Sequence, residues 1–173
     1  MTLSDVANIG TFIGALGAFV SLIYLGLQVR QAELNQRSIA SQGVAARITD
    51  IVQWSAEPHI TRLRTRVIQG DTNFTPEETL QLAFILRVSI LSLQDTHIQF
   101  KSKLTDKTTM ESTIAGTRPL LATPVFQAVW MRGRANFAKE TQDLVDKIIR
   151  ETPRAEPVDI VARFKSDLAA VMA

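Results

Sequence analysis

Residues 6–29 of this 173-residue chain contain no Asp, Glu, Lys, Arg or His, and this run constrains the fold more than any other feature. It reads VANIGTFIGALGAFVSLIYLGLQV and is followed by Arg30. A helix of this length spans ~36 Å at about 1.5 Å per residue, which is enough to cross a hydrocarbon core of about 30 Å. The run therefore predicts a transmembrane helix near the N-terminus.

Buried helices of soluble domains and cleaved signal peptides also contain long apolar runs. This run carries four glycines, each of which costs about 1 kcal/mol relative to Ala in a water-soluble helix but is common in membrane helices. A signal peptide has a basic start and a small-residue cleavage site, whereas no Lys or Arg precedes Arg30. We therefore interpret residues 1–30 as a retained membrane anchor.

Basic residues lie on one side of the predicted span only. The C-terminal flank carries Arg30, Arg37 and Arg47, whereas the N-terminal flank carries Asp5. Because Lys and Arg near a span are retained in the cytoplasm, the N-terminus is expected outside and the rest of the chain in the cytoplasm. Arg30 and Arg37 could also contact anionic lipid head groups, but a solvated face with ordinary topogenic charge is favoured, because the basic residues are more widely spread than in lipid-binding clusters.

Small residues recur along one face of the predicted span, at Gly10, Gly14, Gly17 and Ser21. Such a row lets a second helix approach closely, so that van der Waals packing drives association within lipid. The alternative is that glycine and serine are simply frequent in membrane helices. The row is thus a candidate face for a homo-oligomer or for another membrane protein.

Helical signals continue through the rest of the chain, and no strand alternation is present. Residues 31–57 lack proline and predict a helical stalk that extends the anchor and docks on a helical bundle, the cytoplasmic domain of residues 58–173. Thr75-Pro76 with Glu78 forms a capping-box signal, which predicts a helix over residues 76–103. Further helices are expected over 58–70, 107–121, from Pro124, over 138–151 and after Pro157. The predicted fold is all-α, one long transmembrane helix followed by a bundle.

Catalytic and metal-binding patterns are not evident. Cysteine is absent, the only histidines are His59 and His97, and neither has the spacing of a helical metal site. No nucleophile, base and orienting group cluster in the sequence, so we expect no enzyme and no cofactor. The formal charge of +2, with no basic tract interleaved with aromatics, also disfavours nucleic-acid binding.

Three segments resemble a family of uncharacterised bacterial single-pass membrane proteins of similar size. They are residues 4–31, residues 95–106 and residues 123–149, the last with Phe126, Trp130, Phe137 and Val145-Asp146. Ile98 and Lys103-Leu104 depart from the pattern of that family. The resemblance implies an N-terminal span, a helical cytoplasmic domain and a bacterial inner membrane, but no activity.

Two functions are compatible with these patterns. The first is a membrane-anchored interaction or scaffold protein, either oligomeric or an accessory subunit of a membrane complex. The second is a sensory domain tethered to the membrane, in which the bundle around Arg87 and His97 holds a small molecule or a metal. Arg87 stands in an otherwise apolar helix, where it is expected to snorkel or to be paired.

Overall fold

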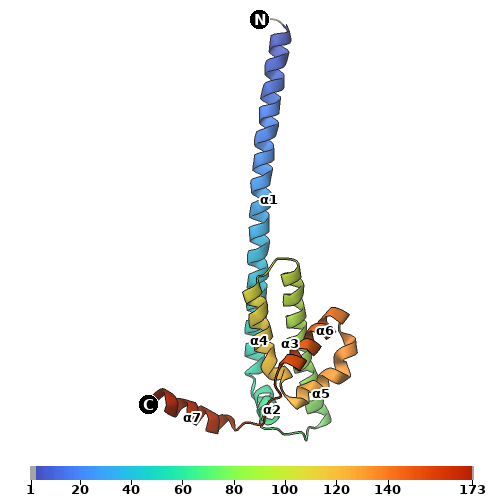
Figure 1. Ribbon diagram of the computed structural model, residues 1–173, viewed down its shortest axis with the longest axis vertical. Helices are drawn as coiled ribbons and strands as arrows, with labels where there is room; N and C mark the ends of the chain where they lie inside the picture. The colour runs from blue at the N-terminus through green and yellow to red at the C-terminus, as the bar shows by residue number, and fades with distance from the viewer. Residues whose placement is uncertain (1–2, 173) are drawn as a thin grey trace. The chain divides into compact units, whose positions relative to one another are not determined.

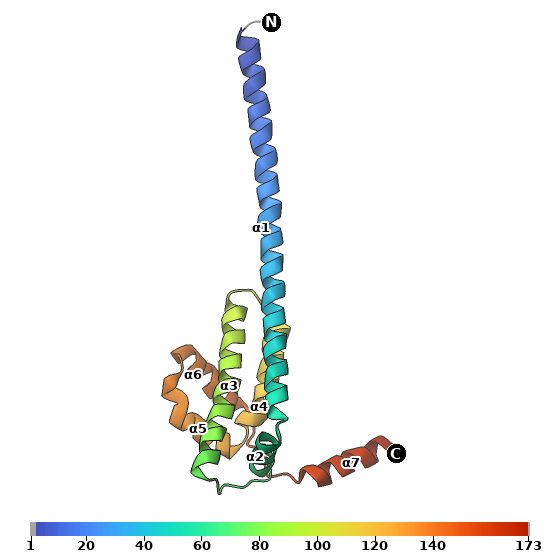
Figure 2. The ribbon, with the colours of Figure 1, turned by 180° about the vertical axis from the view of Figure 1, so that it is seen from behind.

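The computed structural model describes residues 3–172, with the backbone alone at residues 3, 5–7 and 9. Residues 1–2 and 173, the outer ends of the predicted anchor and of the predicted cytoplasmic domain, lie outside the described residues. The described part forms seven α-helices and one short 3-10 helix without any strand (Figures 1 and 2). The expected all-α fold is confirmed.

The longest helix, α1, covers Leu3–Ser55 and contains both the apolar run and the predicted stalk. It continues without interruption through Gly43, a residue that is unfavourable in the interior of a water-soluble helix. Within Gly10–Ser55, and among the described residues only there, a helix is long and apolar enough to cross a membrane. The chain divides into two compact units, Met1–Gln42 and Gly43–Ala173, so the division lies within α1.

In the first unit, all the described side chains between residues 10 and 29 are exposed. The large apolar ones have exposed fractions between 52% at Ile23 and 70% at Phe12. Exposure on this scale is costly in water, at about 25 cal/mol per Å² of apolar surface, and favourable in lipid.

The second unit begins with the last turns of α1, where Val44 is buried. Helix α2 (Pro58–Ile68) follows and buries Ile60, Leu63 and Val67, at the three- and four-residue spacing of one helix face. Gly70, in the turn that follows α2, has φ +85°. A Cβ at this position would lie 2.7 Å from the Cγ of Pro157. Glycine is therefore required at this position by both backbone conformation and space.

Helix α3 (Pro76–Lys101) is central to the bundle. It begins with the predicted capping box, in which Glu78 N donates to Thr75 Oγ1 at 3.2 Å and Thr75 N donates to Glu78 Oε2 at 2.9 Å. The helix ends two residues before the expected Lys103, which adopts a left-handed conformation with φ 59°. Its core face is almost fully buried, at Leu82, Ile85, Leu86, Ile90 and Leu93.

Helices α4 (Lys107–Leu121), α5 (Pro124–Gly133) and α6 (Lys139–Glu151), with the 3-10 helix η1 (Arg134–Asn136), complete the bundle. Helix α3 contacts α4 and α5, and α4 contacts α6. Proline opens α5 as expected, but the hydroxyl of Thr123 donates to the carbonyl of Leu120 at 2.9 Å and does not cap α5. Phe126, Trp130, Val145 and Ile148 fill the core against α3.

The last helix, α7 (Ile160–Met172), follows a tethered segment over residues 152–159. Ala155 N donates to the carbonyl of Ala122 at 2.9 Å, and Val158 N donates to that of Ile68 at 3.0 Å. Beyond this tether none of the α7 residues is buried, and the helix runs outward from the bundle in both views (Figures 1 and 2).

Candidate functional site

An apolar groove lies between the first half of α3 and α5, with a volume of about 660 Å³. From α3 the groove is lined by three apolar residues over about one turn, followed by an arginine one turn later: Leu80, Ala83, Phe84 and Arg87. Helix α5 repeats the same spacing, at Val125, Ala128, Val129 and Arg132. Positions i, i+3, i+4 and i+7 lie on one helix face, so each helix presents a continuous apolar stripe that ends in a positive charge.

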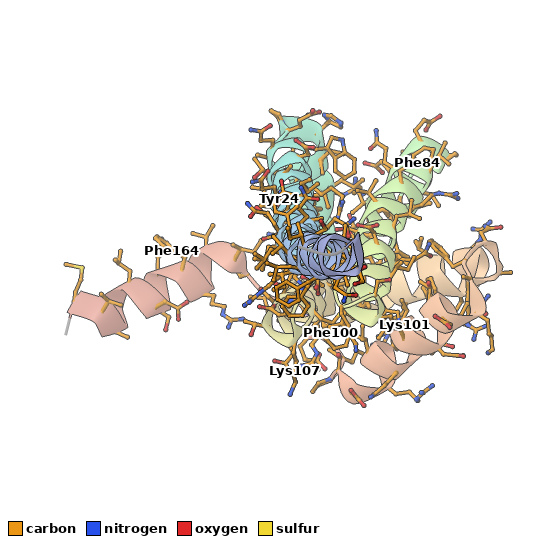
Figure 3. All side chains as sticks on the ribbon, turned by 90° about the horizontal axis from the view of Figure 1, so that it is seen from above. Tyr24, Phe84, Phe100, Lys101, Lys107 and Phe164 are labelled. Carbon is orange, nitrogen blue, oxygen red and sulfur yellow. The ribbon has the colours of Figure 1, made fainter. Side chains whose placement is uncertain are left out.

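The groove is open to solvent along its apolar wall. Leu80 and Phe84 are 56% and 52% exposed, whereas Leu82, Leu86 and Trp130 form a buried floor. Phe84 is labelled on α3 in the view from above (Figure 3). Large apolar side chains that remain exposed together in a concave surface are typical of binding sites.

The charged side chains that line the groove are all positive. Arg87 and Arg132 line it, and no Asp or Glu is among the described residues that do so. Neither arginine forms an ion pair with another described side chain. By contrast, Arg66 and Arg134 are each paired with a carboxylate. The groove therefore offers two uncompensated positive charges beside apolar surface.

A polar network fixes the floor of the groove. Trp130 Nε1 donates to Asp146 Oδ1 at 2.9 Å, and Arg134 Nη2 donates to Asp146 Oδ2 at 2.6 Å. The ring of Phe137 lies 5.3 Å from that of Trp130, centroid to centroid. The Arg134 guanidinium, and then the indole N–H, hold the pKa of Asp146 below its ordinary value, because both favour the carboxylate over the neutral acid.

A second network orients Phe74, which also lines the groove. The guanidinium of Arg66 lies 5.1 Å from the centroid of the Phe74 ring and pairs with Glu78 and, at 2.7 Å, with Asp71. The backbone N–H of Asn73, followed by Arg66, holds the pKa of Asp71 below its ordinary value. The loop between α2 and α3 is thus held by charge and ring contacts.

The small residues of the apolar run lie on α1 within about 60° of one another, at 100° per residue. A Cβ built on Gly10, Gly14 or Gly17 meets no atom within 4 Å, and Ser21 Oγ donates to the carbonyl of Gly17 at 2.8 Å. Their face is therefore open within the single chain.

Arg30 is exposed, and Arg37 Nη2 lies 2.6 Å from Glu33 Oε1 one turn earlier. Arg47, the third basic residue of the flank, pairs with Asp95 of α3, so it contributes to the contact between the end of α1 and the bundle.

Arg87 and His97 are not brought into one site. Arg87 is exposed at the groove, whereas His97 is half-buried, is not part of the groove lining, and has no hydrogen bond at Nδ1 within the described chain. Among residues 3–172, no group of three His, Asp or Glu side chains could hold a metal ion. The polar side chains near His97 serve helix packing instead, since Thr141 Oγ1 donates to Gln94 Oε1 at 2.9 Å.

Helix α7 presents an exposed apolar face. Its large apolar residues lie at three- and four-residue spacing and are 39–84% exposed, at Ile160, Val161, Phe164, Leu168, Val171 and Met172. Phe164 marks this helix in the view from above (Figure 3). The spacing was evident in the sequence and predicted an amphipathic helix, and the structure leaves the large apolar residues of that helix exposed.

Sequence reasoning also missed the groove. Its signal was the matched spacing that ends in Arg87 on α3 and in Arg132 on α5. Comparison of the chain with models of known protein families, with curated proteins and with solved structures finds no match. Proposals about function therefore rest on the described residues alone.

Proposed function

We propose that this chain is a single-pass protein of the bacterial inner membrane that acts as an interaction or scaffold module. The observation that carries the interaction role is α7, whose apolar face of six large side chains is left exposed. A contiguous apolar face of this kind is characteristic of a contact with a partner. The exposed apolar run of α1 supports the membrane location.

The proposed orientation has the N-terminus outside and residues 43–173 in the cytoplasm, as the basic flank at Arg30 and Arg37 favours. The absence of cysteine makes this directly testable, because one introduced thiol is then the only one. In intact cells, a membrane-impermeant maleimide should label Ser4→Cys and should label Ser166→Cys only after permeabilisation. Labelling of Ser166→Cys in intact cells would reverse the orientation.

Self-association through the small residues of α1 is part of the proposal. Oxidative crosslinking of Ser21→Cys in native membranes should give a dimer, and the additional change Gly14→Leu should abolish it by preventing close approach. Ile23→Cys is the matched control, because it lies at nearly the same depth on the opposite face. Equal crosslinking of Ile23→Cys, or no effect of Gly14→Leu, would contradict this face.

The role of α7 is tested by affinity capture of the full chain from mild detergent. Phe164→Asp with Leu168→Asp should release whichever second copy or membrane protein co-purifies. Ala162→Asp with Ser166→Asp places the same charges on the polar face and should retain it. Identical recoveries from the two variants would exclude α7 as the contact.

A sensory domain that binds a small molecule is the second candidate function. The observation that favours it is the apolar groove of about 660 Å³, a volume within the range of small-ligand sites. Saturable binding of any apolar probe by the full chain, lost on filling the groove with Ala128→Trp, would support it. Unchanged binding in that variant would contradict it.

A further inference from the structure

We propose that the groove between α3 and α5 binds an amphipathic anion, that is, an apolar chain carrying a carboxylate or a phosphate. This inference rests on the second candidate function and does not depend on the membrane anchor or on self-association. It assigns the chemistry of the ligand, which the groove volume alone leaves open.

The apolar part of the ligand is specified by the walls. Leu80 and Phe84 on α3 and Val125 and Val129 on α5 line the groove together with the buried Trp130, and Leu80 and Phe84 are more than half exposed. They leave exposed apolar surface that an alkyl chain would cover. Each additional methylene buried there should tighten binding roughly fourfold.

The anionic part is specified by the two arginines. Arg87 and Arg132 lie seven residues beyond Leu80 and Val125, so each ends an apolar stripe about 10 Å long. Guanidinium groups bind carboxylates and phosphates through paired N–H donors. Because no carboxylate lines the groove, a bound anion meets no like charge, whereas a cation would be repelled.

The chain provides its own reporter for this test. It contains two tryptophans, Trp54 and Trp130, of which only Trp130 lines the groove. Trp54→Phe leaves Trp130 as the sole tryptophan of the full chain, held in nanodiscs of phosphatidylcholine. In this background, 11-bromoundecanoate should quench the fluorescence of Trp130 saturably, and unbrominated undecanoate should reverse the quenching. The neutral 11-bromoundecanol should bind at least tenfold more weakly.

Matched variants separate charge from shape. Arg87→Gln with Arg132→Gln should weaken binding of 11-bromoundecanoate at least tenfold, since charge-assisted hydrogen bonds are lost. Arg62→Gln with Arg118→Gln removes two exposed arginines outside the groove and should change the affinity less than twofold. Ala128→Trp should abolish binding without altering the arginines, and its urea midpoint verifies that the bundle is folded.

A second arm distinguishes the source of the anion. The same variants are placed in nanodiscs that contain phosphatidylglycerol with brominated acyl chains. Quenching that depends on Arg87 and Arg132 in this arm identifies a membrane phospholipid, and quenching confined to free 11-bromoundecanoate identifies a soluble fatty acid. Both results support an amphipathic anion.

The outcomes that overturn the inference are distinct from one another. If 11-bromoundecanol and 11-bromoundecanoate bound with equal affinity, the groove would still be a ligand site, but the inference that the ligand is an anion would fail. Absence of saturable quenching by either compound would also remove the second candidate function. If quenching is absent and Ala128→Trp removes the dimer crosslinked at Ser21→Cys, the groove is covered by a second copy of the chain and the inference fails.

Discussion

Two apolar stretches of similar hydropathy behave in opposite ways in this molecule. Residues 10–29 of α1 are exposed throughout, whereas residues 82–93 of α3 bury five large aliphatic side chains, each at most 3% exposed. Helix α3 also tolerates a central Arg87, because that side chain lies on the groove side. Apolar content alone therefore does not distinguish an exposed apolar helix from a core helix; the presence of packed neighbours does.

The largest effect is expected when charged residues are introduced into residues 10–29 of α1. Leu16→Arg with Phe19→Arg should cost a transmembrane helix about 5–7 kcal/mol in total, at roughly 2.5–3.5 kcal/mol per central arginine. The protein should then leave the carbonate-resistant membrane fraction. Leu34→Arg, beyond the apolar run, is the control and should remain in it. Retention of the double variant would show that residues 10–29 are not in lipid.

The next largest effect is expected when one leucine side chain in each stretch is shortened to alanine. Leu93→Ala opens a cavity in the core and should lower the free energy of unfolding of the bundle by about 2–5 kcal/mol. Leu22→Ala, from the exposed stretch, should change it by less than about 0.5 kcal/mol. Urea unfolding of the full chain in nanodiscs, monitored by tryptophan fluorescence, measures the free energy of unfolding of both variants. Similar losses for the two variants would mean that residues 10–29 also pack into a core.

A smaller effect is expected at the polar network beneath the groove. Asp146→Ala leaves the indole N–H of Trp130 without its acceptor and should cost about 1–3 kcal/mol of stability. The pKa of Asp146 lies below its ordinary value of 3.8, so its contribution is full above that pH and is lost as the pH falls through the depressed pKa.

The pH dependence supplies the control for that variant. The stability deficit of Asp146→Ala, measured by urea unfolding, should be constant between pH 7 and pH 5 and should shrink below about pH 4. A deficit that grows on acidification would mean that the Arg134–Asp146 pair does not stabilise the fold.

The smallest effect is expected at the cap of α3. Thr75→Ala removes the acceptor for Glu78 N and should cost about 0.5–2 kcal/mol of bundle stability, with no change in membrane retention. Thr108→Ala, an exposed position in the first turn of α4, should be neutral in the same urea titration. If Thr75→Ala also reduced the amount of protein in the membrane fraction, membrane retention of residues 10–29 would depend on the stability of the bundle.

Local signals predicted most helix boundaries. Pro58, Thr75-Pro76 and Pro124 mark the starts of α2, α3 and α5, and Gly70 ends the turn after α2. Thr123 shows the limit of such signals. Its hydroxyl donates to the carbonyl of Leu120, because the last turn of α4 leaves carbonyls without intrahelical partners and only Ala122 and Thr123 separate α4 from α5.

Non-local packing decided the features that were missed. The spacing of Val161, Phe164 and Leu168 predicts an amphipathic helix, but spacing does not say which surface the apolar face meets. In the same way, the spacing on α5 does not show that Val125 and Val129, which are partly buried against the core, also line the groove.

The sequence by itself determined that the chain is helical, where most helices begin, and that one long stretch carries no charge. These properties depend on residues within about one or two turns of each other, through caps, prolines and side-chain spacing. Only the tertiary structure decided which residues of α3 pack into the core, that two arginines line an apolar groove and that the apolar residues of α7 are left exposed. Burial depends on which helix faces meet across dozens of residues of chain, and the spacing within a single helix carries no information about its partner.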